Sequence, residues 1–174
     1  LLETVAAKDA FASEIRPLAK DWLAEVNDIS LDMRGKKISQ VQWQGQIEKL
    51  FDQADVVDLL KFIDFEKLTH EVQYKDKGER SLRPQFPEVE GLPRELVYGT
   101  QLFALKKDRS VVPHGHMNMA TAFLICKGEF HGRHYDRLED NDESMVIKPT
   151  IDRKFGAGGY SSISDHKDNV HWFK

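Results

Sequence analysis

The sequence predicts a mostly-β domain, either a sandwich or a barrel, that follows a helical segment. Short apolar runs separated by turn residues fill the chain from about residue 96 onward, which is typical of many short strands. Apolar residues in the first third instead recur at a helical period. A third observation, a His-x-His pair at His114 and His116, lies within one of the expected strands. Regularly spaced short strands favour a sandwich or a barrel over a helical fold.

The helical segment is expected over residues 1–76. An apolar stripe in its first part follows the period of a helix, and Pro17 inside the stripe predicts a kink or a new helix start. The stripe consists of Val5, Phe11, Ile15, Leu18, Trp22 and Val26. Stripes of this kind are typical of core packing, so we assign no function to it.

A loop and two further helices are expected in the rest of this segment. Residues 27–28 and 34–35 contain turn-forming types and indicate the loop. A second helix is expected at about 41–51. Asp55 predicts the start of a third, because an aspartate side chain can accept hydrogen bonds from the first N–H groups of a helix. Residues 77–95, which contain three prolines and two glycines, predict a linker or a wrapping arm.

Residues 96–174 are expected to form the β domain. Its candidate strands are 97–106, 111–118, 119–127, 129–138, 145–151, 160–164 and 169–173. The glycine-rich residues 156–159 predict a hairpin or a lid, and the acidic run 139–143 predicts a solvated turn. The chain stops at Lys174, inside or just after the last expected strand, and a closed barrel would need at least one more strand. We therefore expect a barrel that lacks its last strand or strands, or one in which the helical segment supplies the missing pairing.

Composition and charge restrict the function classes. The chain has 174 residues, 40% hydrophobic and 31% charged, with a net charge of −4, so one soluble domain with an ordinary core is expected. Basic residues are interleaved with acidic ones, which argues against a nucleic-acid partner. The apolar run 120–126 has the length of a strand, far below the roughly 20 residues of a membrane span. The single cysteine, Cys126, excludes an internal disulfide and a cysteine-based zinc site. It fits a cytoplasmic location and predicts a buried thiol.

Six of the seven histidines lie between residues 114 and 171, in the strand-rich half. The two-residue period of a strand places His114 and His116 on the same face, about 7 Å apart. Two neutral imidazoles on one face can chelate a divalent metal ion. A third ligand would come from a later strand. The candidates are His171 and His166, and His134 is a candidate for a fourth ligand.

The spacing around this pair resembles the first motif of the cupin superfamily. That motif is Gly-x5-His-x-His, followed after three or four residues by Glu and after six more by Gly. Here His114 and His116 match, Gly128 occupies the turn, and Thr121 stands at the position of the glutamate. The first glycine is absent. The resemblance implies a jelly-roll barrel whose metal site contains histidines and no carboxylate.

The segment 95–174 resembles one cupin branch, the thiol dioxygenases that include plant cysteine oxidases and cysteamine dioxygenase. The shared features are Pro-His-x-His at 113–116, a residue other than glutamate at 121, Gly-x-Phe-His at 128–131, Tyr135-Asp136, and Asp-Asn-Val-His at 168–171. The resemblance implies that His171, in preference to His166, is the third ligand, and that three neutral histidines hold Fe(II). Open positions on the ion would accept a thiolate and O2, and the thiol would be oxidised to a sulfinate.

Two further candidate site residues, Arg133 and Tyr135, come from a single expected strand. Alternation puts them on one face with His131 and Arg137, while His134 faces the other way. If the first face lines the barrel, Tyr135 would donate a hydrogen bond to dioxygen, and Arg133 would hold a substrate carboxylate through a bidentate pair. The alternative is a solvated outer face with cross-strand pairs.

The sequence leads to three function hypotheses. The first is an Fe(II)-dependent dioxygenase that acts with O2 on a thiol or a similar small molecule. The second is a non-catalytic cupin that binds a metal and a small molecule as a sensor or binding module. The third is a zinc or manganese enzyme whose metal acts as a Lewis acid. Zinc, nickel and manganese are the alternatives to iron. Pairing of cupin strands between chains predicts a homodimer.

Overall fold

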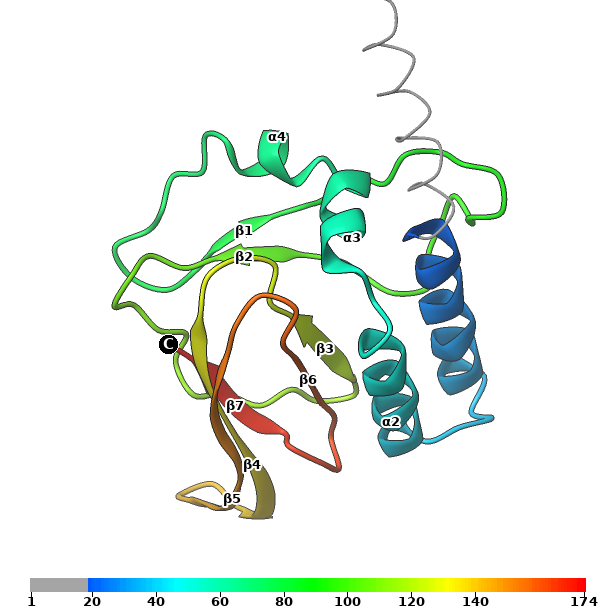
Figure 1. The fold of residues 1–174 in the computed structure, drawn as a ribbon. Helices are drawn as coiled ribbons and strands as arrows, with labels where there is room; N and C mark the ends of the chain where they lie inside the picture. The colour runs from blue at the N-terminus through cyan, green and yellow to red at the C-terminus, as the bar shows by residue number, and fades with distance from the viewer. Residues whose placement is uncertain (1–18) are drawn as a thin grey trace, which may run out of the picture.

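Residues 19–174 are described by the computed structural model, and Figure 1 shows their arrangement. Helices occupy the first part and antiparallel strands the rest, each class covering about 26% of these residues. This order agrees with the predicted helical segment followed by a β-rich domain. The apolar stripe predicted before residue 19, including the kink at Pro17, lies outside the described residues.

The helical part owes its boundaries to side-chain caps. It contains residues 19–34, α2 (Gln40–Phe51), α3 (Val56–Phe62) and the short α4 (Phe65–Thr69). Ser39 begins α2 with a capping box: its hydroxyl accepts from the Gln42 N–H, and the Gln42 side chain accepts from the Ser39 N–H. The Asp55 carboxylate accepts from the N–H groups of Val57 and Asp58, which confirms the predicted cap of α3.

The loop predicted at residues 27–28 is wrong, because the first helix runs through them to residue 34. Asn27 is 3% exposed, and its side-chain oxygen accepts a hydrogen bond from the Val97 N–H at 3.0 Å. An asparagine usually weakens a helix because its side chain competes for nearby backbone groups. Here that side chain is bonded to a distant segment, so the helix continues. The turn predicted at 34–35 is confirmed.

Antiparallel pairing joins the described strands into three sheets. The first pairs β1 (Arg80–Leu82) with β2 (Leu102–Ala104), and the second pairs β3 (Thr121–Leu124) with β6 (Tyr160–Ile163). The third has the order β5-β4-β7, with β4 at Phe130–Asp140, β5 at Met145–Phe155 and β7 at Val170–Phe173. The hairpin of β4 and β5 projects at the bottom of Figure 1.

Two predicted strands differ most from the structure. Residues 111–118 form no continuous strand, and His114 alone makes an isolated bridge. Pro113, which has no N–H to donate, weakens a ladder at this point. The strand predicted at 97–106 is shortened to β2, and its partner β1 lies inside the 77–95 stretch that predicted a linker or arm.

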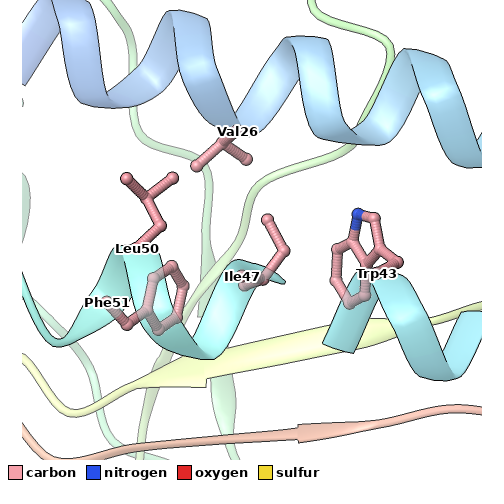
Figure 2. Close-up of a cluster of buried hydrophobic side chains, with 5 residues drawn as sticks. All are labelled: Val26, Trp43, Ile47, Leu50 and Phe51. Carbon is pink, nitrogen blue, oxygen red and sulfur yellow. The ribbon is translucent and has the colours of Figure 1, made fainter. Parts of the chain in front are cut away.

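Three apolar clusters are buried among the described residues, and two of them pack against the sheets. Between the second and third sheets, Ile125, Phe155 and Phe173 are buried, and Phe123 packs against them. The second cluster, drawn in Figure 2, joins the first helix, α2 and the β3–β6 sheet; it consists of Val26, Trp43, Ile47, Leu50 and Phe51. Each such side chain contributes roughly 1.5–3 kcal/mol by leaving water. The sheets do not close into a barrel within the described residues, and a jelly roll is not confirmed.

Candidate metal centre

Three histidines that the sequence predicts as ligands lie together. One ring nitrogen from each of His114, His116 and His171 lies within 4.8 Å of the others. The ring centroids are 4.4 Å apart for His114 and His171, 5.0 Å for His116 and His171, and 5.1 Å for His114 and His116. His171 is 2% exposed, and the other two are half-buried. Among residues 19–174, this is the group of side chains that could hold a metal ion.

Backbone pairing fixes the position of His171 on both sides of its strand. The His114 N–H donates to the His171 carbonyl at 3.2 Å, and the His171 N–H donates to the His114 carbonyl at 2.9 Å. On its other edge β7 pairs with β4, with His171 opposite His134. A slip of one residue would turn every side chain of β7 to the other face, so this double pairing holds the imidazole in the cluster.

Gly115 lets the two neighbouring histidines approach the loop before β7. A Cβ at this position would lie 2.3 Å from Asn169 Oδ1. The Asn169 amide group is held there because its nitrogen donates to the carbonyls of His116, at 2.8 Å, and Ser164, at 3.0 Å. Asn169 thus ties the backbone of one candidate ligand to the segment that carries another.

The Nδ1 atom of each histidine already has a hydrogen-bond partner. His114 Nδ1 lies 2.9 Å from the Val112 carbonyl, and His171 Nδ1 lies 3.1 Å from the Asn169 carbonyl. A carbonyl only accepts, so both Nδ1 atoms carry the proton and both Nε2 atoms keep a free lone pair. Oxygen partners of this kind orient metal-binding histidines and select the tautomer that binds.

Thr121 plays the same part for His116. Its hydroxyl oxygen lies 3.2 Å from His116 Nδ1, and the hydroxyl donates to Met119 Sδ at 3.8 Å. The threonine oxygen is then free to accept from the Nδ1–H of His116. Thr121 therefore orients a candidate ligand, and the group of candidate ligands contains no carboxylate. Three neutral nitrogen donors with free Nε2 lone pairs fit a divalent transition metal.

Burial keeps the imidazoles in the form that binds metal. Loss of water is the largest cause that lowers the pKa of His171 to about 3; the hydrogen bond to the Asn169 carbonyl opposes it, and the neighbouring histidines add to it. Burial followed by the proximity of His114 also lowers the pKa of His116, against an opposing effect of Asp165. Both rings are neutral at pH 7, as metal ligation requires.

The other two candidate ligands lie outside the cluster. His134 is fully buried, and the centroid of its ring lies 5.9 Å from that of His171. Its Nε2 lies 3.4 Å from Ser161 Oγ, and its Nδ1 has no hydrogen-bond partner among the described residues. His166 lies exposed in the loop between β6 and β7. The structure thus brings His171, not His166, to the His-x-His pair.

Arg133 and Tyr135 lie on the face of the sheet opposite the histidine cluster. Arg133 pairs across strands with Trp172, the neighbour of His171, so these side chains point away from the imidazoles. Tyr135 stacks on Trp172 with ring centroids 5.0 Å apart, and the Arg133 guanidinium lies 5.7 Å from the Trp172 ring centre. Arg133 also pairs with Asp152 at 3.1 Å. The structure does not bring the two predicted catalytic residues to the candidate metal site, and it matches the alternative of an outer face with cross-strand pairs.

Cys126 does not contribute to the cluster. Its thiol is partly buried and donates to the Leu124 carbonyl at 3.7 Å. Burial raises the pKa of this thiol, so it stays protonated at neutral pH. The thiol, predicted to be buried, is thus only partly so, and it lacks the thiolate form that a nucleophile requires.

One contributor to the site was not predicted. Asp165 Oδ2 accepts from the Asn118 N–H at 3.0 Å and from the Gln40 side-chain amide at 2.9 Å. These partners lie 47 and 125 residues away along the chain. No local pattern signals contacts over such separations. The sequence offers one signal: Asp165 is the first residue of the segment 165–171, which ends at the candidate ligand His171.

Comparisons with known proteins assign the chain to no family. No protein-family model matches it, and a search of curated proteins finds no match. The described part of the chain contains no helix that is both long and apolar enough to cross a membrane. The geometry of the histidine cluster is therefore the basis of the functional conclusion.

Proposed function

We propose that His114, His116 and His171 hold one divalent metal ion, and that the protein is an Fe(II)-dependent dioxygenase of a thiol. One observation carries the proposal: three imidazoles converge within 4.8 Å while their Nδ1 atoms are engaged by protein oxygens. Structural histidines have no need of such convergence. Ligands of a metal ion require it, together with partners that direct the free lone pairs inward.

The donor set favours iron and a thiol. A ferrous ion in this site would supply the positions at which a thiolate and O2 meet. The three neutral histidines contribute no negative charge, so the site favours an anionic substrate group such as a thiolate. Both oxygen atoms would end on sulfur: RS⁻ and O2 give RSO2⁻, and the two-atom transfer consumes no other reductant.

Residues of the chain shield one side of the site from water. The Phe123 ring centroid lies 5.2 Å from that of His171 and 5.1 Å from that of Phe173. These apolar rings belong to the cluster between the two sheets. They exclude water from the buried side of His171 and strengthen electrostatic attraction between the site and an anion. His114 and His116 are only half-buried, so we expect a small molecule to approach the ion from their side.

Oxygen uptake tests this function. The protein is loaded with Fe(II) without O2 and mixed with small thiols or with a peptide that begins with cysteine. We expect O2 consumption matched by sulfinate, and none with the His171→Ala variant. If the loaded protein consumes no O2 with any of these thiols, the dioxygenase proposal is wrong. Stabilisation by a thiol without turnover would then indicate a binding module, and turnover without O2 would indicate a Lewis-acid enzyme.

A further inference from the structure

We propose that Gln40 of α2 is a positioning residue for the metal centre, acting through Asp165 on the turn that follows His116. The inference rests on the proposed metal site. It makes the helical part of the chain a component of that site, although none of the helical side chains from residue 19 onward belongs to the histidine cluster.

Gln40 and Asp165 are joined by two hydrogen bonds. The Gln40 amide nitrogen donates to Asp165 Oδ2 at 2.9 Å, and the Asp165 N–H donates to Gln40 Oε1 at 2.8 Å. The primary amide thus binds both the side chain and the backbone of one residue, which fixes its position and its rotamer. Hydrogen bonds to a charged oxygen are stronger than those between neutral groups.

Asp165 transmits this position to the segment that carries His116. The carboxylate oxygen that accepts from Gln40 also accepts from the Asn118 N–H at 3.0 Å. Asn118, two residues after His116, has a left-handed backbone with φ of 59°, a conformation that asparagine adopts more readily than most residues. The bond from its N–H to Asp165 fixes this turn.

The other oxygen of Asp165 strengthens the connection to the site. Asp165 Oδ1 is buried and has no hydrogen-bond partner among the described residues. An unpaired carboxylate oxygen is costly to bury unless a cation or a donor lies near it. The metal ion proposed for the histidine cluster would supply a positive charge that lowers this cost.

A second glutamine of α2 separates positioning from general stability. Gln44 is fully buried, and its amide donates to Ser162 Oγ of β6 at 3.1 Å. It fastens the same helix to β6, just before the loop that contains Asp165, but has no bond to Asp165 in the structure. Gln46 on α2 is exposed and serves as a matched surface control.

The test measures metal dissociation constants for the full chain and for Gln40→Ala, Gln44→Ala and Gln46→Ala. Fe(II) is titrated without O2, and Co(II) is used as a second probe because its visible absorption reports ligand geometry. Unfolding midpoints of the metal-free proteins are recorded in parallel. We expect Gln40→Ala to weaken binding at least tenfold, the lower range for the loss of an outer hydrogen-bond partner, and to alter the Co(II) spectrum.

We expect Gln44→Ala to lower the unfolding midpoint at least as much as Gln40→Ala does. The metal dissociation constant of Gln44→Ala should nevertheless stay within about twofold of that of the unmodified protein. Unchanged binding in Gln40→Ala would overturn the positioning role and leave the proposed function intact. Equal losses of affinity in the two buried variants would also overturn it, because general destabilisation would then explain both. If the unmodified protein binds neither ion, the proposed metal site itself is wrong, and the positioning role with it.

Discussion

His114 and His171 exchange two backbone hydrogen bonds, although they belong to distant parts of the sequence. This bridge places their ring centroids 4.4 Å apart. The third histidine, His116, follows His114 by two residues. The site therefore depends on one strand, β7, paired on one edge with β4 and on the other with the segment that carries the His-x-His pair. Changes that disturb this pairing should disturb metal binding.

Replacement of Thr121 by valine tests the orientation of His116. The substitution preserves shape and removes the oxygen that lies 3.2 Å from His116 Nδ1. We expect the metal dissociation constant to rise about tenfold, since such oxygens orient ligand imidazoles. Thr69→Val is the control, because it removes a hydroxyl that bonds the Phe65 carbonyl within α4. Equal affinities in the two variants would show that the Thr121 hydroxyl does not orient a ligand.

Replacement of Gly115 by alanine tests the close approach beside Asn169. A Cβ would lie 2.3 Å from Asn169 Oδ1, so that side chain must move and release the His116 carbonyl. We expect the free energy of unfolding to fall by about 1–3 kcal/mol and metal affinity to fall with it. Urea unfolding and metal titration measure the two effects.

The matched control for this substitution is Gly45→Ala in α2. A Cβ there would meet nothing within 4 Å, and alanine favours a helix over glycine by roughly 0.5–1 kcal/mol. This variant should be slightly more stable and bind metal normally. A Gly115→Ala protein as stable as Gly45→Ala would contradict the packing described for Asn169.

Acid should destabilise the metal-free protein even before its carboxylates titrate. Burial lowers the pKa of His134 to about 4 and that of His171 to about 3, from a usual value of 6.5. Below pH 6.5 the unfolded chain therefore binds more protons than the folded one, and the free energy of unfolding falls as the pH falls. Between pH 6.5 and its lowered pKa, each of these two histidines reduces the free energy of unfolding by up to about 1.4 kcal/mol for each unit that the pH falls.

The contribution of the histidines is measured by the slope of the free energy of unfolding against pH between pH 7 and pH 5. His134→Gln is expected to lower the free energy of unfolding at pH 7 but to flatten its dependence on pH, because one buried group no longer titrates. Urea unfolding at several pH values gives both quantities. Identical slopes in the variant and the unmodified protein would mean that His134 is not held neutral by the fold.

Substitutions at Arg133 and Tyr135 should leave the metal site intact. Both side chains contact Trp172 on the face away from the histidines. We expect Tyr135→Phe and Arg133→Ala to bind metal with unchanged affinity. Arg133→Ala should lower the free energy of unfolding by no more than about 1 kcal/mol, because the ion pair that it removes is exposed. A large loss of metal affinity in either variant would contradict their placement on the outer face.

Local sequence patterns predicted the parts of the fold that local physics determines. Asp55 is followed by a helix because its carboxylate binds the first N–H groups, and the turn types around β4 and β5 were evident in the sequence. The continuous helix through Asn27 was not predicted, because its partner, the Val97 N–H, is remote in sequence. Tertiary contact overrides local preference at such positions.

The candidate site shows the same division. The His-x-His pair and its likeness to a cupin motif predicted two candidate ligands, and the likeness of residues 168–171 to the thiol dioxygenases predicted the third. The structure brings these three together. Alternation alone could not decide which face of β4 turns inward, so Arg133 and Tyr135 were expected at the site. The register of β4 against β7 puts His134 on the inner face. The contribution of Gln40 could not be foreseen, since it depends on packing between segments 125 residues apart.

The metal site is tested most directly by the number of Fe(II) ions bound per chain under anaerobic conditions. This number is measured for the unmodified protein and for single alanine variants of His114, His116, His171 and His166. Three converging imidazoles predict about one ion per chain in the unmodified protein and in His166→Ala. They predict loss of binding in each of the other three. Full binding of Fe(II) by His171→Ala, or no binding by the unmodified protein, would show that these three histidines do not form one metal site.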